Sequence, residues 1–213
     1  MIVMVREIAY SDIKDSLKTG DLMLFHGVAP TSELIEIIEW SYWSHVGMVV
    51  IPEDIGLTGR DPLIWESTSS GDGIEDVINK APKDNGAMLI SLEERIRVDL
   101  VNHFDTHFKV KYISRALDDV ELEKLKNFIY AAHDKSFPDT KGLLKGYVDG
   151  KHYNKPTPDN EAFCSQLAAE TYMAMDILST KYVANGYCPN DFNEDKELPI
   201  LKPFYFLDGA RLK

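Results

Sequence analysis

The chain has few cysteines, no long apolar run and no cluster of basic residues, and each of these absences excludes a class of protein. Cys164 and Cys188 are the two cysteines among 213 residues, so at most one bridge is available and no disulfide framework. No stretch approaches the roughly 18 continuous apolar residues of a transmembrane helix. Charged residues interrupt the apolar N-terminus too early for a signal peptide, so we expect a cytoplasmic protein without an integral membrane segment.

The charge balance argues against polyanionic partners. The net charge is −12 and the lysines and arginines form no run. Nucleic-acid binding needs a positive footprint, and so does binding to an anionic membrane surface. The hydrophobic content of 44% and the length suffice for a real core. With no repeat and no linker, we expect a single domain over residues 1–213.

Short apolar and β-branched segments predict strands mainly in the first half of the chain. The expected strands are 22–25, 45–51, 62–67, 86–92 and 107–113. Helical spacing of apolar residues predicts helices over 32–40, from Asp118 or Asp119 to about Ala132, and from Cys164 onward. Residues 136–161 contain three prolines and are expected to be mostly irregular.

This order of elements favours an α+β protein. Strands come first and the longer helices later, which predicts a mostly antiparallel sheet with helices packed against it. A parallel sheet would need regular alternation of strands and helices, which the sequence lacks.

Cys164 opens an apolar stripe at the N-terminal end of its predicted helix. The unpaired amides and the positive dipole end there favour a thiolate, whereas Asp159 and Glu161 nearby oppose it. A cysteine at this place is either a nucleophile that needs a histidine partner or a small apolar core residue.

Most of the six histidines are poor candidates for that partner. His103 and His107 in "HFDTH" are four residues apart and could place two metal ligands on one helix face. No HExxH motif or second cysteine–histidine cluster completes the set, and His107 also fits a strand. His26, His133 and His152 lie at element ends or in loops and are expected at the surface.

His45 differs because it opens an apolar strand, where an imidazole without partners is costly to bury. Its strand face continues through Gly47, which leaves space beside the ring. The next strand ends in "IWES" and places Glu66 in an equally apolar setting. If the two strands are adjacent, Glu66 reaches one ring nitrogen of His45 and leaves the other for a thiol. A buried histidine–glutamate pair without catalysis is the alternative.

An ordered set of four segments carries a family resemblance. The segments are "LKTGDLMLF" (17–25), "WSHVGMVV" (43–50), "LIWEST" (63–68) and "FCSQLAAETY" (163–172). Together they resemble the circularly permuted branch of the NlpC-type papain-fold cysteine hydrolases. The likeness is greatest to the YiiX-like group and more distant to the lecithin retinol acyltransferase group.

The resemblance implies a permuted papain-like fold with a partly barrel-like sheet, in which the nucleophile helix lies in the C-terminal half. It also implies Cys164 as nucleophile, His45 as base and Glu66 as the polar third residue. The third residue is commonly histidine in the lecithin retinol acyltransferase-like enzymes, so the glutamate points to the YiiX-like side.

The implied chemistry is hydrolysis of an amide or ester through a thioester. His45 takes the thiol proton and Cys164 attacks the carbonyl carbon. We expect the backbone amides of Cys164 and Ser165 to hold the oxyanion. No metal or organic cofactor is required.

The substrate is less well determined by the sequence. Trp40, Trp43 and Trp65 flank the predicted site and suit an apolar or stacked group, although each also fits an ordinary core. The negative charge favours a small peptide, or another amide or ester substrate, that carries a free amine, as in cell-wall peptides. The alternatives are a lipid-directed thioesterase or acyltransferase, and a papain-like fold used as a binding module.

Overall fold

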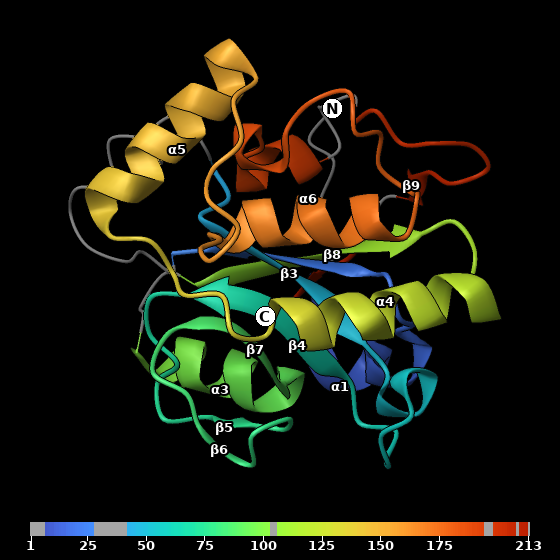
Figure 1. Cartoon of the computed structure of the whole chain (residues 1–213). Helices are drawn as coiled ribbons and strands as arrows, with labels where there is room; N and C mark the ends of the chain where they lie inside the picture. Colours follow the sequence, from blue (N-terminus) through green and yellow to red (C-terminus); the bar gives the residue numbers. More distant parts are fainter. Residues whose placement is uncertain (1–6, 28–41, 103–105, 194–197, 208, 213) are drawn as a thin grey trace, which may run out of the picture.

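The computed structural model describes residues 7–27, 42–102, 106–193, 198–207 and 209–212. Helices lie on both sides of a mostly antiparallel sheet (Figure 1). This arrangement confirms the α+β class that the order of elements predicted.

The strands follow one path in the order β1–β10–β8–β2–β3–β4–β7–β5–β6, with β9 paired to β8. Their bounds are β1 Glu7–Ile8, β2 Leu22–His26, β3 His45–Val50, β4 Leu63–Thr68, β5 Glu75–Asp76, β6 Ala81–Pro82, β7 Gly86–Ser91, β8 His107–Ile113, β9 Phe206–Leu207 and β10 Arg211–Leu212. The pairs are antiparallel except that of β1 with β10. Within the described residues the path is open at both ends, so the sheet is not a closed barrel.

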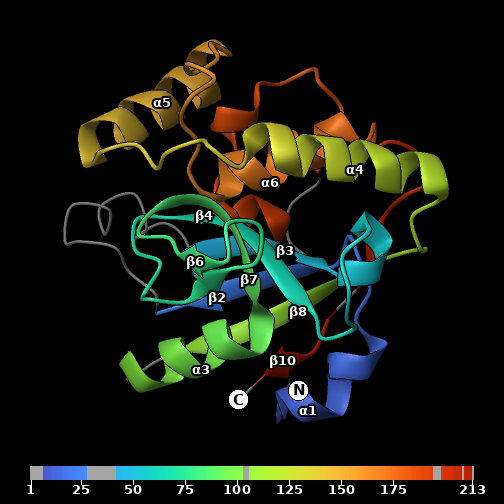
Figure 2. The same ribbon diagram turned by 60° about the horizontal axis from the view of Figure 1, so that its bottom comes forward.

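The helices divide between the two faces of the sheet. Their bounds are α1 Tyr10–Ile13, α3 Leu92–Asn102, α4 Asp119–Ala132, α5 Thr140–Tyr153 and α6 Cys164–Ala174, with 3₁₀ turns η1 Lys14–Ser16, η2 Pro52–Ile55, η3 Ala184–Gly186 and η4 Pro189–Phe192. Figures 1 and 2 show α4 and α6 on one side and α1 and α3 on the other. Within the described chain, none of these helices has the length and apolar character needed to cross a membrane.

The alternation of strand side chains builds a separate core on each face. Trp65 of β4 packs in the same core as Leu167 of α6. Its neighbour Ile64 points the other way and packs with Ile96 of α3. Because side chains alternate along a strand, Glu66 shares the α3 face with Ile64.

The five predicted central strands all exist, as β2, β3, β4, β7 and β8. The helix predicted from Asp118 or Asp119 is α4, and Asp118 caps it by accepting from the amides of Val120 and Glu121. The helix that holds Cys164 is α6. The helix predicted over 32–40 lies outside the described residues.

The expectation that residues 136–161 are mostly irregular is wrong, because α5 occupies Thr140–Tyr153. This helix carries a glycine at every fourth position, which lowers its intrinsic helix propensity and hides it from the sequence pattern. The glycines allow close packing: a Cβ atom on Gly150 would lie 2.6 Å from the carbonyl carbon of Asn185. Asp139 caps the first turn. Tertiary packing and a cap therefore outweigh propensity.

The "TGD" turn before β2 joins the sheet to α6. Gly20 has a φ of +95°, which favours glycine, and its carbonyl accepts a hydrogen bond from the Tyr172 hydroxyl at 2.7 Å. The buried carboxyl of Asp21 accepts from the amides of Ile113 and Lys18. The turn is therefore a structural junction between β2, β8 and α6.

Gly47 allows β3 and β4 to approach with large side chains on the α3 face. A Cβ atom at Gly47 would lie 2.6 Å from both Cγ1 and Cδ1 of Ile64 and 3.2 Å from Cβ of Glu66. No side chain but hydrogen fits there without displacing one of these neighbours.

We therefore expect Gly47→Ala to lower the free energy of unfolding by about 1–3 kcal/mol, the usual cost of overpacking a buried site. Chemical denaturation measures this change. Ile64→Ala deletes both contacted atoms, so the double variant should lose less stability than the sum of the two single variants. Additive losses would show that the contact with Ile64 is not the cause.

Candidate active site

His45 and Glu66 form a buried pair between two adjacent strands. The Nε2 atom of His45 lies 2.6 Å from Oε2 of Glu66, and the two side chains are 7% and 0% exposed. Glu66 and Gly47 are neighbours on one face of the sheet. Because Gly47 has no side chain, the Glu66 carboxylate can extend across this position to the His45 ring. The Nδ1 atom of His45 is left for another partner, as the sequence predicted if these strands were neighbours.

Cys164 is the first residue of α6. Phe163 precedes it and provides no side-chain cap, and the first intrahelical bond runs from the amide of Leu167 to the carbonyl of Phe163. The amides of the first turn therefore have no acceptor within the helix. The first turn contains no acidic residue, and Cys164 is 9% exposed.

The segment before α6 is fixed by the same strand that carries Glu66. Ser67, on the opposite face of β4, donates a hydrogen bond to the carbonyl of Ala162 at 2.6 Å. The amide of Ala162 donates to the carbonyl of Ser136. Strand β4 thus supplies a carboxylate on one face and an anchor for the cysteine on the other.

The His45 ring interacts with Cys164 as well as with Glu66, and both interactions affect its pKa. Burial alone lowers this pKa, but the charge of Glu66 and the charge and hydrogen bond of Cys164 outweigh burial and raise it to about 10. The interactions with both side chains favour the imidazolium form at neutral pH.

Glu66 stays ionised in spite of its burial. Desolvation raises the pKa of a buried carboxyl, but the positive charges of Arg95 and His45 lower it below the ordinary value. Two cations on opposite sides of one carboxylate therefore offset its burial.

Arg95 is a site residue that the sequence analysis missed. It lies on α3, is 1% exposed, and places Nε 3.2 Å from Oε1 of Glu66. Within α3, Leu92, Arg95, Ile96 and Asp99 are buried at helical spacing. The detectable signal was an arginine and an aspartate at positions where an amphipathic helix has apolar residues.

Trp43, Trp65 and Ser165 are buried beside the site. Both indoles are 1% exposed and belong to the core under α6, which is the alternative that the sequence left open. The Trp65 indole donates to the Thr171 hydroxyl at 3.1 Å. The Ser165 hydroxyl donates to the carbonyl of Tyr187 at 2.9 Å, so its side chain fixes α6.

The other histidines have structural surroundings. His107 begins β8 and stacks on His26, while His103 lies outside the described residues. His133 is not a surface residue as expected: it is 4% exposed, and its ring contacts the buried carboxylate of Asp76 at 2.9 Å. In the described ranges no three histidine, cysteine or acidic residues gather as a metal site.

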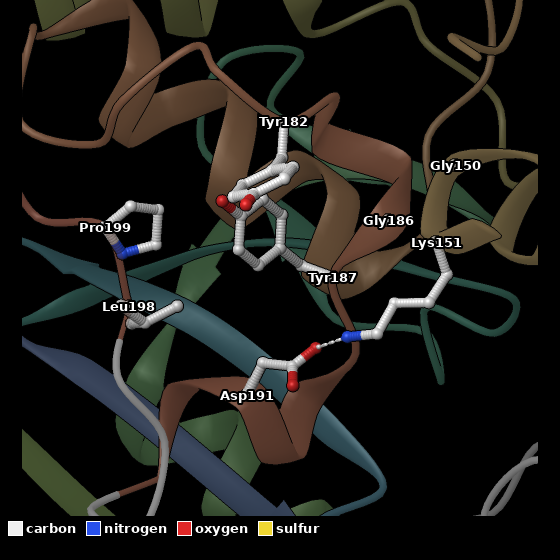
Figure 3. Close-up of a pocket in the computed structure, with 8 residues that line it drawn as sticks. All are labelled: Gly150, Lys151, Tyr182, Gly186, Tyr187, Asp191, Leu198 and Pro199. Atoms are coloured by element: carbon white, nitrogen blue, oxygen red, sulfur yellow. Dashed lines mark hydrogen bonds and ion pairs between the residues drawn. The ribbon is translucent and has the colours of Figure 1, made fainter. Parts of the chain in front are cut away.

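A cavity of about 270 Å³ borders the C-terminal part of α5 (Figure 3). It is lined by Gly150, Lys151, Tyr182, Gly186, Tyr187, Asp191, Leu198 and Pro199. Lys151 and Asp191 form an ion pair at 3.1 Å, away from the tyrosine rings. The buried hydroxyl of Tyr187 has no hydrogen-bond partner among the described residues, and burial raises its pKa to about 12, so it remains a donor.

Cys188 has a different environment from Cys164. Burial and the carboxylate of Asp191 raise the pKa of the Cys188 thiol. The two cysteines are both free thiols, and only Cys164 interacts with a buried histidine.

Proteins similar to this chain are found among solved structures. No family model matches the chain and no curated protein matches it. One similar solved structure is described as metalloprotein yiiX from Escherichia coli O157:H7, DUF1105, with 16% identity and a TM-score of 0.47. The match covers 73% of this chain and 64% of that protein, less than two thirds of its length.

We expect the His45 imidazole to titrate near pH 10, well above the ordinary value of about 6.5. The protonated form of histidine is the charged one, so a raised pKa keeps the ring charged across neutral pH. The ring loses its proton as the pH rises towards 10. Glu66→Gln and Cys164→Ala should each lower this pKa, since each removes a group that raises it.

Imidazole resonances followed by NMR over pH measure the effect, with His152→Gln as an assignment control on an exposed histidine. A His45 pKa at or below 6.5 would contradict the charged pair.

Proposed function

We propose that this chain is a cysteine hydrolase with a permuted papain-like fold in a single domain, and that it cleaves an amide bond through a thioester. The observation that carries this proposal is the position of His45, which pairs with Glu66 through Nε2 and interacts with Cys164 at the start of α6. Nucleophile, base and orienting carboxylate are the groups that covalent acyl chemistry needs.

In the first half of the reaction, the Cys164 proton passes to Nδ1 of His45 and the thiolate attacks the substrate carbonyl carbon. Glu66 accepts the Nε2–H bond, fixes the ring and stabilises its positive charge. The oxyanion is held by first-turn amides of α6, including those of Cys164 and Ser165. The intermediate collapses to a thioester as His45 donates its proton to the leaving amine.

In the second half, neutral His45 takes a proton from a water molecule, which attacks the thioester carbonyl. The second tetrahedral intermediate releases a carboxylic acid, and the proton on His45 returns to the sulfur of Cys164 or remains as the imidazolium of the ion pair. His45 therefore takes up a proton in each half of the reaction and donates one to the leaving amine.

The substrate is proposed to be a small peptide or related amide with a free amine, because the chain carries a net charge of −12. A lipid-directed thioesterase or acyltransferase would use the same thioester, and product analysis distinguishes hydrolysis from transfer. A binding module would not need a buried histidine that interacts with both a carboxylate and a cysteine.

We further propose that part of the substrate binds in the cavity beside α5. This replaces the expectation that Trp43 and Trp65 contact the substrate, since both indoles are buried in the core. The hydrogen bond from Ser165 to the carbonyl of Tyr187 joins the cavity wall to the residue after Cys164. The unpartnered Tyr187 hydroxyl supplies a donor for a substrate oxygen.

Cys164→Ala should abolish turnover of any substrate that the wild type cleaves, while the fold is retained, because the change removes one sulfur atom. Cys188→Ser should leave turnover almost intact. Turnover is measured by product formation and folding by circular dichroism. Wild-type rates in Cys164→Ala would remove Cys164 as nucleophile.

Tyr187→Phe should raise KM several-fold and leave kcat nearly unchanged, because only a binding hydrogen bond is lost. Tyr153→Phe, at an exposed tyrosine of α5 that is not among the residues lining the cavity, is the control. An unchanged KM in Tyr187→Phe would place the substrate elsewhere.

A further inference from the structure

The Arg95 guanidinium lies among three carboxyl groups beneath the sheet. Its Nε is 3.2 Å from Oε1 of Glu66 and 3.5 Å from Oδ2 of Asp99, and one terminal nitrogen donates to Asp72 at 2.7 Å. The side chains of Arg95, Glu66 and Asp99 are at most 1% exposed, while that of Asp72 is 27% exposed. A buried charge cluster thus continues from His45 through Glu66 to Arg95 and Asp99, with Asp72 at its more exposed edge.

The two neighbouring aspartates are unequal partners. Asp72 makes the aligned hydrogen bond and fixes one end of the guanidinium. Both carboxyl oxygens of Asp99 lack hydrogen-bond partners among the described residues, and burial raises the pKa of this group to about 7. Glu66 is the nearer of the two buried carboxyl groups to Nε, at 3.2 Å against 3.5 Å, and Arg95 meets both as ion pairs rather than as aligned hydrogen bonds.

The proposed reaction explains why Glu66 needs a second cation. His45 is positive while it pairs with the thiolate, but it becomes neutral when it protonates the leaving amine. At that stage Glu66 would be a buried carboxylate without a counter-charge, and such a group takes up a proton instead. A permanently charged group on its other oxygen prevents this, because arginine does not lose its proton in proteins.

We propose that Arg95 is a positioning residue that keeps Glu66 ionised and oriented throughout the catalytic cycle, so that His45 alone carries the moving proton. This inference rests on the proposed cysteine hydrolase function. Arg95 touches no reacting atom in this scheme and acts through Glu66.

The test is the pH dependence of Cys164 alkylation by iodoacetamide, read by intact mass and peptide mapping, which needs no substrate. In the wild type, Cys164 should react faster than Cys188 and should already react at mildly acid pH. In Arg95→Gln, Glu66 loses a counter-charge and supports the imidazolium less well. The acid limb of the profile, where the alkylation rate of Cys164 falls with falling pH, should then move to higher pH by at least about one unit. At a fixed pH on this limb the rate should be about tenfold lower than in the wild type.

Two further variants separate charge from packing. Arg95→Lys keeps the positive charge and should restore most of the acid limb. Arg97→Gln removes an exposed arginine two residues away, which pairs with Glu94 on the surface, and should leave the profile unchanged. A packing role alone would change stability in Arg95→Gln without moving the limb.

The decisive comparison is between Glu66→Gln and the double variant that also carries Arg95→Gln. The double variant lacks the buried Glu66 charge that Arg95→Gln alone leaves with one cation fewer, so it serves if Arg95→Gln alone does not fold. If Arg95 acts through Glu66, adding Arg95→Gln to Glu66→Gln should shift the limb no further. A further shift of a full unit in the double variant would overturn the inference, as would a folded Arg95→Gln with the wild-type limb. A wild-type Cys164 that reacts like an unassisted thiol, near pH 8.5, would instead overturn the proposed function itself.

Discussion

The burial of the Glu66 carboxylate is the constraint on which most of the site depends. A carboxylate that is 0% exposed in its side chain must have opposite charges and hydrogen bonds around it, or it becomes protonated. His45 meets it from β3 and Arg95 meets it from α3. The close approach that brings the first of these partners to the carboxylate is possible because Gly47 has no side chain.

The same constraint relates the two faces of the sheet. Glu66 and Ser67 are neighbours on β4 and point to opposite sides, as strand geometry requires. One takes part in the charged cluster towards α3, and the other holds Ala162 just before α6. A one-residue shift of β4 would exchange these roles and separate Cys164 from its histidine. The register of β4 with β7, which pairs six consecutive residues, therefore also fixes the geometry of the site.

Much of this arrangement was predictable because local patterns and tertiary structure agree in the central strands. A histidine at the start of one apolar strand and a glutamate near the end of the next are each costly to bury alone, which predicts that they pair. The helix α5 was not predictable, because its glycines are unfavourable until Asn185 packs against Gly150 and Thr157 packs against Gly146. Arg95 and the buried His133 were missed for a related reason: single charged residues look like surface residues until their partners, Glu66 and Asp76, are placed.

The charges of the cluster respond to pH in opposite directions. The pKa of Glu66 is lowered, so its stabilising contribution is present above its unfolded value of about 4.5 and is lost as the pH falls through the folded value. The pKa of His45 is raised, so its contribution is complete below about 6.5 and is lost as the pH rises towards 10. Asp99 has a pKa raised from about 3.8 to about 7, so its contribution to stability falls as the pH rises through this range. The cluster therefore stabilises the fold most at weakly acid pH, while the charged His45 that the proposed chemistry needs persists well above it.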